Sequence, residues 1–71
     1  MKQEQIVSRD SEIMSGALVF AGTRVPVEIL IQHLAAGDSL FEFLDDFPTV
    51  SREQAVAYLL MTLEVAGARV A

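Results

Sequence analysis

The fold is decided by the stretch PVEILIQHLAAGDSLFEFLDDFPTVSREQAVAYLLMTLEVA, residues 26–66. Its apolar residues recur every three or four positions, which is typical of amphipathic helices. Pro26 suits the first turn of a helix, where its missing N–H would have no partner. Gly37 is typical of the residue that follows the last turn of a helix. We therefore predict a first helix over residues 26–36.

Two serine residues predict where the next two helices begin. Ser39 precedes Glu42 by three positions, and Ser51 precedes Gln54 by the same distance. Both pairs have the spacing of a capping box, in which each residue of the pair bonds the backbone N–H of the other. Pro48 ends the second helix, because the residue before a proline avoids helical geometry. The predicted helices cover residues 40–47 and 52–66.

The N-terminal part has short apolar runs at residues 5–8 and 17–20, and Gly16 and Gly22 flank the second run. Short runs bounded by glycine are typical of strands. We predict a β-hairpin or β-ribbon over residues 5–20, which pairs either within the chain or across a dimer; the alternative is an irregular arm. The fold class is mainly α, and residues 1–71 form a single domain.

Composition excludes several classes of protein. The 71 residues are 52% hydrophobic and contain no cysteine, which excludes a disordered chain, a disulfide framework and a thiolate metal site. Five basic and ten acidic residues give a net charge of −5, and the cations are scattered, which disfavours autonomous DNA binding. There is no leader-like segment and no apolar run long enough for a membrane span. We expect a cytoplasmic protein without membrane contact.

The sequence offers no constellation for catalysis. His33 is the only histidine, which disfavours a catalytic triad or a histidine-based metal site within one chain. We expect a solvated imidazole there, on the polar side of the first helix. Asp45 and Asp46 are adjacent, so their side chains diverge on a helix. The glycines form no nucleotide-binding pattern. We predict no enzyme activity, no cofactor and no metal.

The predicted helix over residues 52–66 is apolar on two sides. We assign to the core the residues Ala55, Val56, Leu59, Leu60 and Leu63. We assign to the opposite side the residues Ala57, Tyr58, Met61 and Val65. Because a helix that is apolar all round is buried all round, we expect this second side to contact another polypeptide, with a homo-oligomer as the first expectation. The alternative is that the N-terminal ribbon folds back over it.

Phe41 lies off the predicted core side of its helix and is close to Glu42, Asp45 and Asp46. An aromatic residue among carboxylates is suited to anchor a basic partner. The alternative is an ordinary solvated acidic side that has no partner.

Four residues form a candidate DNA contact. The second and third predicted helices have the length pattern of a helix-turn-helix, whose second helix offers its first residues to the major groove. These residues are Ser51, Arg52 and Gln54. Arg24, beside a glycine-led turn, either ties that turn to a carboxylate or carbonyl, or contacts a phosphate.

The blocks GTRVPV (22–27), LAAG (34–37), FLDDFP (43–48) and SREQA (51–55) together resemble the family catalogued as domain of unknown function 433. The resemblance covers residues 5–66. It implies a homeodomain-like helix-turn-helix bundle of three helices with an N-terminal β element. It also implies an antitoxin related to VapB-type antitoxins, paired with a PIN-like ribonuclease toxin in a type II toxin–antitoxin system.

These observations give one expected function and two alternatives. The first is a non-catalytic antitoxin that binds and neutralises its toxin and regulates its own operon. Under this hypothesis the toxin contacts Phe41, Glu42, Asp45 and Asp46, or the second side of the last helix. The alternatives are a transcriptional regulator that binds DNA through its last helix, and a purely structural oligomerisation module.

Overall fold

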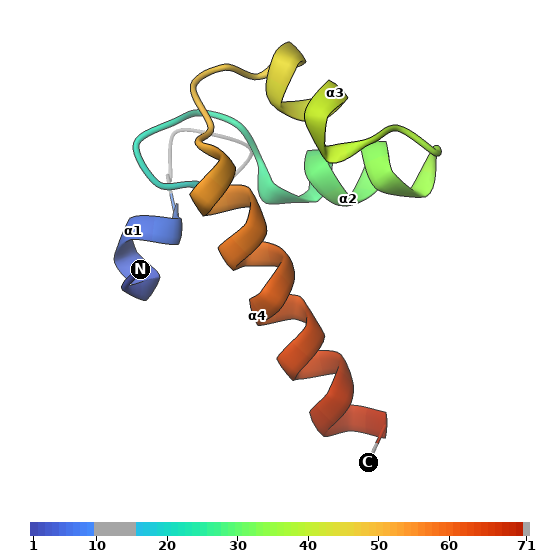
Figure 1. Ribbon diagram of the computed structural model, residues 1–71. Coiled ribbons are helices and arrows are strands. Elements are labelled where there is room, and N and C mark those ends of the chain that lie inside the picture. Colours follow the sequence, from blue (N-terminus) through green and yellow to red (C-terminus); the bar gives the residue numbers. More distant parts are fainter. Residues whose placement is uncertain (10–15, 71) are drawn as a thin grey trace.

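The structure is a computed structural model that describes residues 1–9 and 16–70, with side chains described as far as Val65 along the last helix (Figure 1). In order, its elements are α1 (Gln3–Ile6), β1 (Val7–Arg9), β2 (Leu18–Phe20), α2 (Val27–Ala35), α3 (Leu40–Asp46) and α4 (Arg52–Val70). The described part is therefore mainly helical with a small antiparallel sheet, which confirms the predicted class.

The predicted N-terminal β element is confirmed as two antiparallel strands that pair within the chain, and residues 10–15 of the predicted range lie outside the described residues. Val7 lies opposite Phe20 and Arg9 lies opposite Leu18. The hairpin begins later than expected, because Gln5 belongs to the short helix α1, which we did not predict. The backbone N–H of Lys2 donates to Oε1 of Gln5 at 2.9 Å, and the N–H of Gln5 donates to the carbonyl of Lys2. These local bonds favour a helical turn over an extended arm.

Both predicted capping boxes are present. The N–H of Glu42 donates to Oγ of Ser39 at 3.1 Å, and the N–H of Ser39 donates to the Glu42 carboxylate at 3.3 Å. Ser51 and Gln54 make the same pair of bonds at 3.0 and 3.1 Å. The caps fix the starts of α3 and α4, whereas the end of α4 lies at Val70, beyond the predicted residue 66. A glycine inside a helix costs only about 1 kcal/mol, so Gly67 does not end it.

The core lies where β2, α2, α3 and the first half of α4 meet. Phe20, Leu30 and Phe43 are completely buried there. The ring of Phe20 lies 6.0 Å from the ring of Phe43 and 5.6 Å from that of Tyr58, in an edge-to-face contact with the latter. One strand thereby joins α3 to α4.

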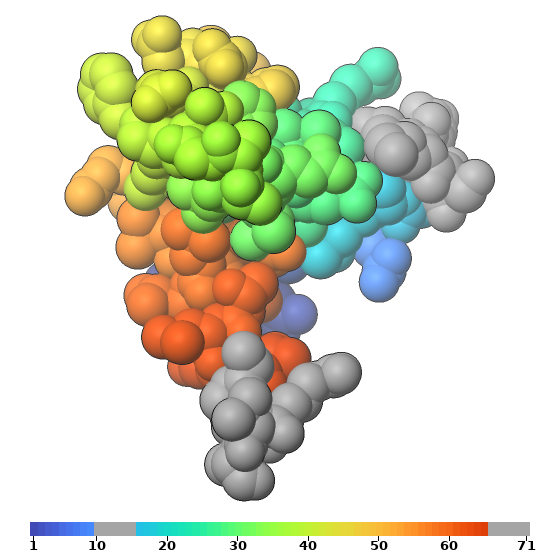
Figure 2. Space-filling model, turned by 90° about the vertical axis from the view of Figure 1, so that its right-hand side faces the viewer, coloured from blue at the N-terminus to red at the C-terminus, as the bar shows by residue number. Residues whose placement is uncertain are grey.

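The second half of α4 extends away from this body. In Figure 1, α1 lies beside the start of α4, and the rest of α4 continues past it toward the C-terminus. Figure 2 shows the same projection below the mass formed by α2 and α3. The molecule measures 36 × 26 × 23 Å. Within the described residues, none of the helices combines the length and the apolar run needed to cross a bilayer.

Candidate interaction surfaces

Helix α3 carries an exposed acidic surface, which we call the α3 acidic face. It consists of Phe41, Glu42, Asp45 and Asp46, all of which are exposed. Phe41 is 79% exposed, more than any other large apolar side chain in the described part of the chain. Residues four apart lie on the same side of a helix, so Phe41 neighbours Asp45, and Glu42 neighbours Asp46. The predicted grouping is thus present on one surface.

The carboxylates of the α3 acidic face have no basic partner within the described residues. The one ion pair found there joins His33 to Asp38, and no basic residue lies in the last turn of α3. Asp45 and Asp46 end this helix, where the helix dipole disfavours negative charge by roughly 0.3–1 kcal/mol for each group. These two aspartates therefore contribute no charge stabilisation to their own helix.

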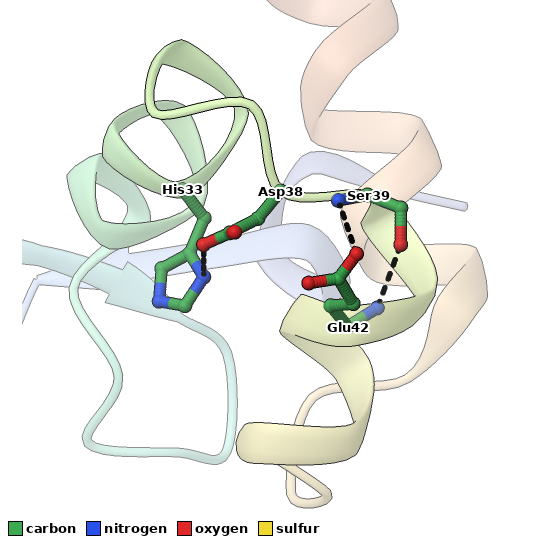
Figure 3. A network of polar contacts seen from close by, with 4 residues as sticks. All are labelled: His33, Asp38, Ser39 and Glu42. Carbon is green, nitrogen blue, oxygen red and sulfur yellow. Dashed lines mark hydrogen bonds and ion pairs between the residues drawn. The ribbon is translucent and has the colours of Figure 1, made fainter.

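Figure 3 shows two local contacts at the connection between α2 and α3, His33 with Asp38 and Ser39 with Glu42. Nδ1 of His33 lies 3.1 Å from Oδ2 of Asp38, in the geometry of an ion pair and not of a directed hydrogen bond. The same imidazole packs edge-on against Phe43 and Phe47, with ring centroids 5.6 and 5.7 Å away. Our expectation of a solvated His33 was wrong, because the rings of Phe43 and Phe47 cover much of the imidazole. The periodicity of α2 alone contains no information about that cover.

The assignment of the two sides of α4 needs correction. Ala57, Tyr58 and Met61 are half-buried and pack against the core, although we placed them on the outer side. Leu60 and Leu63, which we placed in the core, are 56% and 66% exposed. Val65 is 55% exposed, because α4 has left the core by that point. Contact between this helix and a partner stays a prediction.

Gln54 explains the misassignment. A polar residue normally marks the solvent side of a helix, but Gln54 is only 8% exposed. Its Nε2 donates to the carbonyls of Gln5 at 3.0 Å and Ala21 at 2.8 Å. These bonds turn the side of α4 that carries Gln54 and Tyr58 toward the N-terminal segment. Helix α1, which belongs to that segment, packs against α4. The N-terminal part of the chain thus contacts this side at Gln54, through the carbonyls of Gln5 and Ala21, and at Tyr58, through the ring of Phe20.

The candidate DNA-contacting residues lie in different environments. Ser51 and Arg52 are exposed at the start of α4, whereas Gln54 is buried and both of its amide N–H groups are in use. Arg24 is exposed, and it makes no hydrogen bond or ion pair with another described residue. Its turn is held by Thr23, whose Oγ1 donates to the carbonyl of Phe20 at 2.8 Å and accepts from the N–H of Val25 at 3.1 Å.

The described residues offer little for small ligands. No three side chains of His, Cys, Asp or Glu among them come together as a metal site would require. One hollow of about 210 Å³ lies beside Leu18, Pro26 and Glu28. Small-molecule sites usually enclose ~300–1,000 Å³, so this hollow is below the usual size.

A family described as "Protein of unknown function (DUF433)" has a sequence model that matches residues 7–60. The match runs from β1 through the first half of α4, and it includes the whole α3 acidic face. Comparison with curated proteins gives no match, and neither does comparison with solved structures.

Proposed function

The chain belongs to the DUF433 family, and from that premise we propose that it is a non-catalytic antitoxin-like protein. In this role it binds and neutralises, in the cytoplasm, a PIN-like ribonuclease toxin of a type II toxin–antitoxin pair. The choice of toxin class follows from the resemblance of its motifs to antitoxin-like members of the family. The α3 acidic face is the observation that supports a binding role for this particular chain.

The charge of the α3 acidic face suits an RNA-cleaving partner. A protein that binds RNA must attract phosphates with Lys and Arg side chains. Three exposed carboxylates on one helix present the complementary sign, which speeds encounter and selects the partner. The proposed antitoxin thus occupies the basic surface that the toxin uses for RNA.

Phe41 supplies the apolar part of the proposed contact. Charge pairs at the rim of an interface add little affinity, whereas an aromatic residue that enters a pocket at its centre often carries much of it. Phe41 is 79% exposed and stands beside the carboxylates. The contacts of His33 with Phe43 and Phe47 fix the helix that carries Phe41, so binding orders the Phe41 side chain but not its backbone.

Co-expression with the product of the adjacent gene tests the proposal. The two proteins should co-purify, and Phe41→Ala should weaken the complex by about 2 kcal/mol, which is roughly 30-fold, as expected for a central anchor. The double variant Asp45→Asn/Asp46→Asn should slow association most strongly at low salt. Its free energy of unfolding should stay equal or rise slightly, because it removes two carboxylates from the end of α3.

The matched control is Glu53→Gln/Glu64→Gln, which removes two exposed charges from α4 instead. This variant should bind the toxin at nearly the wild-type rate. Two proteins that fail to co-purify would overturn the proposed function. Equal effects of the two double variants would overturn the assignment of the α3 acidic face.

DNA binding is the second candidate, and the exposure of Ser51 and Arg52 at the start of α4 supports it. In this proposal α3, the turn and α4 act as a homeodomain-like helix-turn-helix, and the protein or its toxin complex regulates its own operon. A mobility shift on the promoter region should weaken with Arg52→Ala and with added salt. Lys2→Ala, which removes one positive charge elsewhere, is the control. No shift at low salt would dismiss this candidate.

A further inference from the structure

We draw no further inference here: the strongest candidate, the exposed apolar patch that Leu60 and Leu63 form on the outward side of α4, carries none, because nothing in the structure shows what covers it.

Discussion

At the scale of single residues, Gln54 connects three parts of the backbone. Its Oε1 accepts from the N–H of Ser51, and its Nε2 donates to the carbonyls of Gln5 and Ala21. The carbonyls of Gln5 and Ala21 lie 49 and 33 residues before Gln54 in the chain. A buried amide that satisfies distant carbonyls specifies one way for the N-terminal segment to meet α4.

Replacing Gln54 with Met should therefore destabilise the fold. Met keeps the length of the side chain but removes both donors and the acceptor. A buried polar group left without a partner costs about 1–3 kcal/mol. Because Gln5 is exposed and Ala21 is half-buried, water can replace part of the lost bonding, and we expect a loss of roughly 1–3 kcal/mol in the free energy of unfolding. Urea denaturation followed by circular dichroism measures it.

Ser51→Ala separates the cap from the two carbonyl bonds. It removes only the Oγ that accepts from the N–H of Gln54, which should cost about 1 kcal/mol. If Gln54→Met costs no more than Ser51→Ala, the bonds to Gln5 and Ala21 do not stabilise the fold.

The pKa of the Tyr58 phenol determines how the free energy of unfolding should change at alkaline pH. Burial, and then the nearby Glu28 carboxylate, raise the pKa of its phenol above the ordinary value of about 10. The folded state therefore prefers the neutral phenol, while the unfolded state ionises freely. The resulting stability is fully present below pH ~10 and is lost as the pH rises through the folded-state pKa.

Urea denaturation between about pH 9 and pH 11 checks this expectation. The free energy of unfolding should fall more steeply in the wild type than in Tyr58→Phe, which has no proton to lose. Glu28→Gln, which removes only the charge near the phenol, should give an intermediate slope. Equal slopes for the wild type and Tyr58→Phe would contradict the prediction.

At the scale of elements, the local signals predicted more than the packing. The starts of α3 and α4 followed from Ser39 and Ser51, because a capping box needs only residues three apart. The exposed grouping on α3 was also predictable, since four residues of a short helix share one side. The sequence pattern did not predict α1, because four residues are too few to show a helical periodicity.

The sides of α4 could not be assigned from the sequence, because long-range contacts decide them. Both Leu60 and Tyr58 are apolar enough to be buried. Which of them faces the core depends on the side of the helix that Gln54 turns inward. That polar side chain turns inward only because the carbonyls of Gln5 and Ala21 accept hydrogen bonds from its amide. His33 follows the same rule, since the rings of α3 cover it from outside its own helix.

At the scale of the whole molecule, the small body and the extended α4 make stability sensitive to association. A partner at 100 times its Kd adds about 2.7 kcal/mol to a folded state that binds it. When the partner is a second copy, about half of that gain falls to each chain. Because 1 kcal/mol shifts the Tm of a domain this size by roughly 4–8 °C, the homo-oligomer predicted from the sequence would be visible in thermal unfolding.

If the chain forms the predicted homo-oligomer through the exposed Leu60 and Leu63, the Tm of the wild type should rise by roughly 5–10 °C as concentration increases from the Kd to about 100 times that value. The Tm of Leu60→Gln/Leu63→Gln should stay constant over the same range, because a monomer unfolds without a concentration term. At the lowest concentration the two proteins should unfold at similar temperatures, since these exposed leucines contribute little to the monomer. A variant that is less stable at every concentration by the same amount would place the leucines in the core of the monomer instead. Differential scanning calorimetry measures the Tm of both proteins at each concentration.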